Sequence, residues 1–152
     1  ALGRSRAWQQ ALSFLRALHR RGAAPSLVTC NTAIGACAAG EAWQHALALF
    51  SAAFRQELSP DTVSYNVCLH ALSCGQQWPL AVGLLRAMAS RSVQPNVISY
   101  NTTISACERR GEWKLAEALL EEMRQGGTRP DAVSYHAVIS AHAKAGHLRG
   151  AL

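Results

Sequence analysis

The chain has 152 residues, of which 49% are hydrophobic and 16% are charged, which is enough apolar content to bury the core of one domain. This composition excludes intrinsic disorder as the default state. Every apolar stretch falls short of the roughly 18 residues of a membrane-spanning helix, so we expect no membrane partner. The formal net charge of +6 favours a polyanionic partner.

The five cysteines are an odd number, and none lies in a Cys-x-x-Cys pair or at the Cys/His spacing of a zinc site. A disulfide framework and a bound metal are therefore both disfavoured. The sequence also shows no constellation of residues typical of a catalytic site. We expect neither a cofactor nor an enzymatic activity.

Four residue types recur along the chain at one interval of 35 residues. The series are Pro25, Pro60, Pro95 and Pro130; Trp8, Trp43, Trp78 and Trp113; Ala11, Ala46, Ala81, Ala116 and Ala151; and Asn31, Asn66 and Asn101, with His136 in the fourth place. Residues 62–96 and 97–131 align without a gap and are identical at eleven positions. A fixed period of this length indicates a tandem repeat.

Each repeat contains two segments in which apolar residues recur at spacings of three and four, separated by a polar break. In the second repeat the first segment includes Val63, Val67 and Ala71. Asp61 or Thr62 lies at the expected N-cap of this segment, and a proline follows Trp78 where a second helix would open. The pattern predicts two amphipathic helices per repeat.

A helix pair of this size cannot bury both of its apolar faces, so consecutive pairs must stack. The predicted fold is therefore all-α, an α-solenoid of stacked antiparallel helix pairs that winds as a right-handed superhelix. We expect one array over residues 1–152. Its predicted parts are the second helix of a preceding repeat, three complete repeats and a truncated repeat, at residues 1–26, 27–61, 62–96, 97–131 and 132–152.

A tetrad of similar residues opens each first helix. The tetrads are Val28-Thr29-Cys30-Asn31, Val63-Ser64-Tyr65-Asn66, Ile98-Ser99-Tyr100-Asn101 and Val133-Ser134-Tyr135-His136. Together with the 35-residue period, the Leu-Leu and Met of the second helix and the closing Pro-Asp or Pro-Asn, they resemble the pentatricopeptide repeat over essentially the whole chain. The sequence departs from that pattern in its tryptophans and in His136.

The resemblance implies binding of single-stranded RNA, with one base bound per repeat. The implied base-selecting pairs are Asn31 with Asp61, Asn66 with Asn96, and Asn101 with Asp131. The apolar residues implied to lie between neighbouring bases are Val28, Val63, Ile98 and Val133. The resemblance also suggests phosphate contacts at Arg109 and Lys144, although the equivalent residues of the other repeats are Ala39 and Cys74.

The chemistry of the paired residues agrees with the bases that the family's recognition rules assign. An Asn amide carries a donor and an acceptor, so it can meet the Watson–Crick edge of a pyrimidine. Uracil presents an N3–H donor and cytosine an N3 acceptor, so an Asp partner favours uracil and an Asn partner accommodates cytosine. The predicted trinucleotide is U, C, U in the 5′ to 3′ direction, and His136 receives no assignment.

Structural roles are the alternative for each of these residues. A recurrent Asn can bond to backbone groups, and Asp61 and Asp131 can act as N-caps alone. The four apolar residues of the tetrads can belong to the core. We interpret the tryptophans as packing between repeats rather than as platforms for base stacking.

The functional hypothesis is a sequence-selective RNA-binding module of organellar RNA processing, stability or translation. Its location in a mitochondrion or chloroplast rests on the family resemblance alone. One alternative is a helical-repeat scaffold that binds proteins or peptides. Another is the targeting arm of an enzyme with a catalytic domain elsewhere in a longer chain. Additional protein partners, and self-association through uncapped ends, are also expected.

Overall fold

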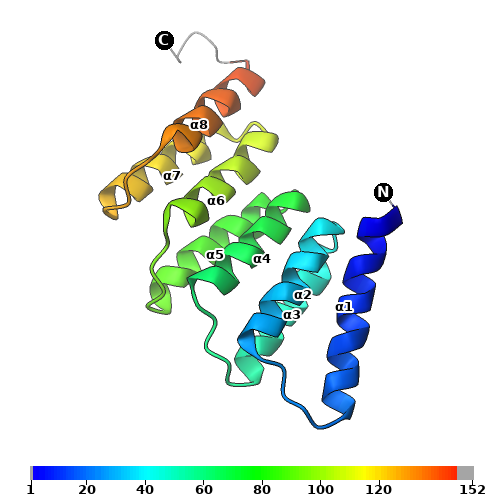
Figure 1. Cartoon of the computed structure of the whole chain (residues 1–152). Helices are drawn as coiled ribbons and strands as arrows, with labels where there is room; N and C mark the ends of the chain where they lie inside the picture. Colours follow the sequence, from blue (N-terminus) through cyan, green and yellow to red (C-terminus); the bar gives the residue numbers. More distant parts are fainter. Residues whose placement is uncertain (1, 147–152) are drawn as a thin grey trace. The chain divides into compact units, whose positions relative to one another are not determined.

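The structure is a computed structural model that describes residues 2–146, with side chains from residue 6 onward. This part of the chain folds into eight α-helices without a strand (Figure 1). They are α1 (Leu2–Arg20), α2 (Leu27–Ala39), α3 (Trp43–Arg55), α4 (Thr62–Cys74), α5 (Trp78–Ser90), α6 (Val97–Arg109), α7 (Trp113–Gln125) and α8 (Ala132–Lys144). Residue 1 and residues 147–152 of the predicted terminal segments, including Ala151, lie outside the described part. The predicted all-α fold is confirmed.

The helices from α2 to α8 follow the sequence period. The first helices begin at residues 27, 62, 97 and 132 and the second helices at residues 43, 78 and 113, and each of these helices has 13 residues. Helix α1 differs because it has 19 residues and begins before Trp8, whereas the other three tryptophans each begin their helix. The division of the chain into repeats stays a prediction.

The helices group into two compact units that meet after Gly75. In the first unit, α2 packs against α1, α3 and α4, and α3 also packs against α4. In the second unit, α6 packs against α5, α7 and α8, and α7 also packs against α8. Helices α2 and α6 thus each lie beside their own second helix and beside the next first helix of the same unit, as expected of stacked helix pairs.

Left-handed backbone recurs at two places, one directly after the first helix of a pair and one directly after the second. Glu41, Gln76, Gly111 and Gly146 follow the first helices, and Gly22, Glu57, Ser92 and Gly127 follow the second helices. A left-handed residue ends a helix and turns the chain back sharply. This explains why a connection as short as residues 40–42 suffices between α2 and the antiparallel α3 (Figure 1).

The recurring alanines belong to the core. Ala46, Ala81 and Ala116 are fully buried, as are larger side chains such as Tyr65 and Leu119. In the first unit the ring of Phe50 meets that of Tyr65 edge-on at 4.9 Å. Small and large buried side chains together give the dense packing that a core requires.

Cys68 and Cys107 are deeply buried cysteines of the core. Burial raises the pKa of the Cys68 thiol to about 12 and that of Cys107 to about 11, with the charge of Glu112 adding to the second shift. Both thiols are therefore protonated at neutral pH and are poor nucleophiles. Among the described residues, none of the helices is long and apolar enough to cross a bilayer.

Candidate nucleic-acid interface

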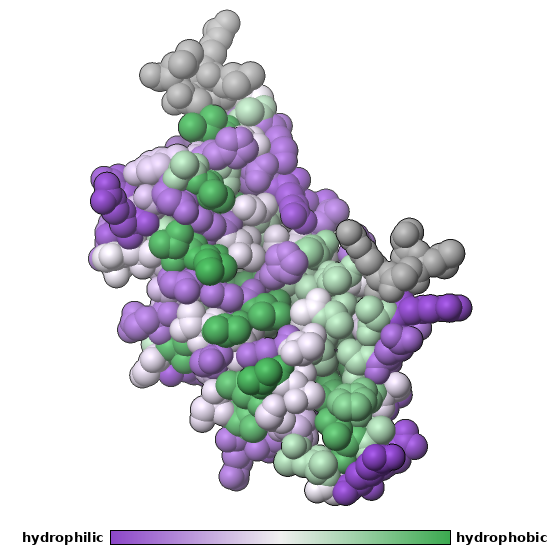
Figure 2. All heavy atoms as spheres, viewed as in Figure 1, coloured by the Kyte–Doolittle hydropathy of each residue, from purple (hydrophilic) through white to green (hydrophobic). Residues whose placement is uncertain are grey.

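The apolar residues that open the tetrads lie on the surface. Val28, Val63, Ile98 and Val133 are each the second residue of a first helix, and their exposed fractions run from 55% at Val133 to 75% at Val28. Figure 2 shows apolar patches between polar ones on the face that carries the first helices. The alternative in which these residues belong to the core is wrong, because the first turn of each helix points them to solvent.

The residues that end the tetrads follow three positions later, so they share a helix face with the exposed apolar residues. Asn31, Asn66 and Asn101 are partly buried, whereas His136 is exposed. Each first helix thus presents an exposed aliphatic side chain and, one turn further along, a polar group. The roles predicted for these residues in base separation and base-edge contact stay predictions.

The residues that follow the closing prolines are N-caps. Asp61, Asn96 and Asp131 each accept a hydrogen bond from a backbone N–H three residues later, at 2.9, 3.1 and 3.0 Å respectively. The side chain of the serine at that later position accepts a hydrogen bond from the cap residue's own N–H, which completes a capping box. Capping is therefore confirmed, and it is compatible with contact to a base.

Capping lowers the pKa of both carboxylates. The bond from the Ser64 N–H holds the pKa of Asp61 below its ordinary value against a small opposing effect of burial. The bond from the Ser134 N–H does the same for the pKa of Asp131, and the Asn101 side chain adds to the effect. Both groups are therefore charged acceptors at neutral pH.

Helices α6 and α8 bring one predicted base-selecting pair into contact. Asn101 Nδ2 donates to Asp131 Oδ1 at 3.0 Å, and Ser134 Oγ donates to Asn101 Oδ1 at 2.6 Å. Ser134 Oγ also lies 3.0 Å from Asp131 Oδ1. The serine and the aspartate therefore fix which side of the Asn101 amide carries the donor.

The other two pairs differ from this one. Asn31 Oδ1 is buried without a hydrogen-bond partner among the described residues, while Asp61 binds Ser64. Asn66 belongs to the first unit and Asn96 to the second. The hydrogen-bonded form of the pair is thus seen between α6 and α8.

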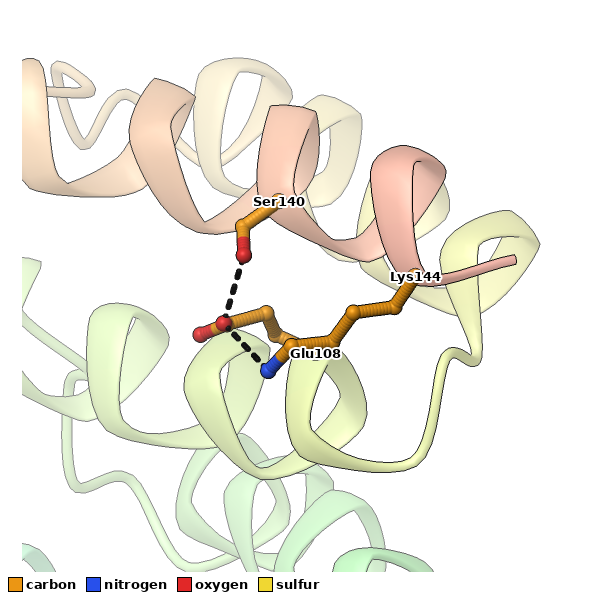
Figure 3. Close-up of polar contacts among 3 residues, drawn as sticks. All are labelled: Glu108, Ser140 and Lys144. Carbon is orange, nitrogen blue, oxygen red and sulfur yellow. Dashed lines mark hydrogen bonds and ion pairs between the residues drawn. The ribbon is translucent and has the colours of Figure 1, made fainter. Parts of the chain in front are cut away.

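The suggested phosphate-binding residues lie at the end of their helices. Arg109 is exposed. Lys144 Nζ lies 2.9 Å from Glu108 Oε1, and Ser140 Oγ donates to the same oxygen at 2.7 Å (Figure 3). Burial acts to raise the pKa of Glu108, but the bonds from Lys144 and Ser140 outweigh it and lower that pKa. A phosphate at Lys144 would therefore compete with a charged carboxylate.

Trp43 and Trp113 pack between consecutive helix pairs. Trp43 is half-buried, and a Cβ added at Gly75 at the end of α4 would lie 2.6 Å from its Cγ. In the second unit the ring of Trp113 lies 4.8 Å from that of His142 on α8. His142 Nε2 in turn lies 2.8 Å from Glu117 Oε1. These contacts support the interpretation of the tryptophans as packing residues.

Three features of this face were not predicted from the sequence. These are the cap at Asn96, the contacts of Ser134 and the ion pair between Glu108 and Lys144. The cap at Asn96 could have been predicted from the sequence, because Asp or Asn followed three positions later by Ser recurs at each first helix from α4 onward. The other two could not, because they join side chains of different helices.

The comparisons with known proteins agree with this geometry. A model of the PPR repeat family matches residues 60–109 and 95–144, and a model of the pentatricopeptide repeat domain matches residues 13–75. No curated protein matches the chain.

Solved structures with the same fold include pentatricopeptide repeat proteins. The maize protein PPR10 is 29% identical with a TM-score of 0.81 over 88% of this chain, and PPR10 in complex with an 18-nt psaJ RNA element is 28% identical with a TM-score of 0.78 over 90%. The chain spans 19% and 20% of those two chains.

A third structure shows the fold alone. The PPR domain of Arabidopsis thaliana protein-only RNase P 1, in complex with tRNA, is 14% identical with a TM-score of 0.79, over 95% of this chain and 78% of that one. The family models together match most of the sequence, and they match the same helices that carry the tetrads and the capping boxes. The chain belongs to the pentatricopeptide repeat family.

Proposed function

We propose that this chain is a sequence-selective single-stranded RNA-binding module that contacts one base per repeat. The observation that carries the proposal is the exposure of an aliphatic side chain on all four first helices, each followed one turn later by an amide or imidazole. Exposed aliphatic groups at regular spacing suit the faces of separated bases, and the polar groups suit their edges. The RNA held by the related maize protein supports the same assignment.

The contacts of Asp131 suggest how a repeat would select uracil. The bonds from the Ser134 N–H and the Asn101 amide both converge on Oδ1, and the Ser134 hydroxyl oxygen lies 3.0 Å from the same atom. Asp131 is an exposed residue, so Oδ2 is the atom that would accept a hydrogen bond from uracil N3–H. Cytosine has no donor at N3, and a carboxylate beside its N3 lone pair is unfavourable.

Carried over to the three predicted repeats at residues 27–61, 62–96 and 97–131, this chemistry gives the sequence U, C, U from 5′ to 3′. Asp61 and Asp131 would select the two uracils. Asn96 offers an amide that can donate to the N3 acceptor of cytosine. The exposed position of Asn96 at the start of α6 supports this role.

The test is a low-salt anisotropy titration of the chain against short RNAs with a central UCU, UUU or AGA. Asn96→Asp is the informative variant, because an aspartate caps α4 and α8 with the same bonds that Asn96 makes to α6. The helix cap is thus preserved while the group offered to the base changes. We expect the wild type to prefer UCU and the variant to prefer UUU.

Asp131→Asn is the reciprocal control and should move preference at the third base from uracil to cytosine. Equal binding of all three RNAs by the wild type would contradict the base assignments. Absence of RNA binding, together with retention of a protein partner, would instead support the alternative of a protein-binding helical scaffold.

The proposed role is in RNA processing, stability or translation. A mitochondrial or chloroplast location is an expectation from the family. Because the chain spans about a fifth of the maize protein, a function as the targeting arm of a larger enzyme is also compatible with this proposal.

A further inference from the structure

A hollow of about 480 Å³ lies between α1 and α3 in the first unit, on side chains that take no part in the proposed RNA interface. Leu12 and Leu15 of α1 and Leu49 and Ala52 of α3 line it, and Cys30 of α2 is buried at its floor. Its volume lies within the range of small-molecule sites, which are mostly apolar with a few polar groups.

The edge of the hollow is basic. Arg16, His19 and Arg20 of α1 and His45 of α3 line it, and none of its lining residues is an Asp or Glu. Arg16 and Arg20 are exposed and lie four residues apart on one helix face, where like charges repel. The ring of His45 lies tilted against that of Trp8 of α1, with 4.8 Å between the ring centroids. This contact with α1 places the His45 imidazole at the edge of the hollow.

The second unit has an ion pair at the equivalent place. Arg86 of α5 and Glu122 of α7 form an ion pair at 3.7 Å. In the 35-residue register these positions correspond to Arg16 and Ala52 in the first unit. Ala52 supplies no carboxylate to pair with Arg16. The Arg16 side chain therefore lies beside the apolar lining of the hollow, at the position where the second unit has an ion pair.

We propose that this hollow binds an amphipathic anion, with an alkyl chain against the leucines and a carboxylate beside Arg16 and Arg20. The basic residues at the edge are the reason for proposing an anion, because the apolar floor alone would accept any alkyl chain. A second hollow of about 300 Å³ shares His19, Pro25 and Gln56 with the first and extends toward Leu58, which gives an alkyl chain room to continue. The site is independent of the proposed RNA interface.

The experiment is isothermal titration of the chain with laurate, and with dodecylamine, which has the same alkyl chain and the opposite charge, both below their micellar concentrations. Ala52→Glu is the informative variant, since it introduces the carboxylate found at Glu122. Ala87→Glu is its matched control, because Ala87 has the same register position on α5, is also partly buried and lies outside the hollow.

We expect one laurate per chain, dodecylamine binding at least about tenfold more weakly, and a loss of at least about tenfold in laurate affinity for Ala52→Glu but not for Ala87→Glu. Arg16→Gln, which keeps the helix and creates no new charge, should also weaken laurate binding. Absence of laurate binding, equal binding of the two ligands, or an equal loss in the two alanine variants would each overturn the proposal.

Discussion

At the scale of single residues, Asp61 and Asp131 cap helices, and this role can be tested by pH separately from their proposed role in base selection. The pKa of each carboxyl group is lowered because it accepts a hydrogen bond from a backbone N–H at a helix start. A depressed pKa in the folded state gives a stability contribution that is complete above the ordinary value of about 3.9. That contribution is lost as the pH falls through the folded-state pKa.

We therefore expect the thermal midpoint of the wild type to fall on acidification below about pH 4 more steeply than that of the double variant Asp61→Asn and Asp131→Asn. The asparagines keep an acceptor at each helix start but do not titrate. Circular dichroism melts over a pH series measure the difference. Parallel curves for the two proteins would show that these caps do not contribute to the acid sensitivity.

The ion pair between Glu108 and Lys144 is the second feature at this scale. In the proposed RNA complex, Glu108→Gln frees Lys144 for a phosphate and removes a negative charge from the first helices. We expect tighter RNA binding and a salt dependence steeper by about 0.7 in log–log slope, the value for one further phosphate contact on a single strand.

Glu121→Gln is the control for this experiment, because Glu121 pairs with Arg124 on α7 and the change in net charge is the same. Anisotropy titrations at several salt concentrations give both slopes. An identical effect of the two variants would assign the gain to net charge rather than to Lys144.

At the scale of elements, two glycines in comparable helices should respond to alanine in opposite directions. Gly75 ends α4 with a φ of −77°, which any residue adopts, but a Cβ there would meet the Trp43 ring. We expect Gly75→Ala to lower the free energy of unfolding by about 1–3 kcal/mol through overpacking.

Gly83 lies inside α5 beside open space, so a Cβ added there would meet no neighbour within 4 Å. Gly83→Ala should raise the free energy of unfolding by about 0.5–1 kcal/mol, because glycine is costly inside a helix. Urea denaturation of both variants measures the changes. A rise in the free energy of unfolding for Gly75→Ala would contradict the packing role of Trp43.

The period of the sequence was sufficient to predict most of these elements. Prolines at a fixed interval indicated the loops, and apolar residues at spacings of three and four indicated the two helices of each repeat. The length of α1 was not predicted, because nothing in the repeat specifies residues before Trp8. The bond from Ser134 to Asn101 was not predicted either, because a contact between residues 33 positions apart depends on how α6 and α8 pack.

At the scale of the whole molecule, the number of repeats limits the affinity for RNA. Contacts to each base are worth roughly 1–3 kcal/mol, so the three predicted complete repeats of the proposed RNA-binding module would give about 3–9 kcal/mol before other costs. Association itself costs about 4–15 kcal/mol. The isolated chain should therefore bind weakly, and the net charge of +6 should make that binding sensitive to salt.

Helix α8 exposes two side chains at positions that are buried one repeat earlier. Tyr135 is 47% and Ile139 53% exposed, whereas the equivalent Tyr100 and Ile104 are 6% and 0% exposed. A contiguous apolar face of this kind favours association between chains. We expect the chain to self-associate as its concentration rises, and the double variant Tyr135→Ser and Ile139→Lys to stay monomeric.

Leu80→Lys serves as the control, because Leu80 is an exposed apolar residue of α5, outside the α8 face. Sedimentation velocity over a concentration series distinguishes the three proteins. Association of the wild type and of Leu80→Lys, but not of the double variant, assigns the contact to α8. Equal behaviour of all three proteins would contradict that assignment and would show that this apolar face remains in solvent at the concentrations tested.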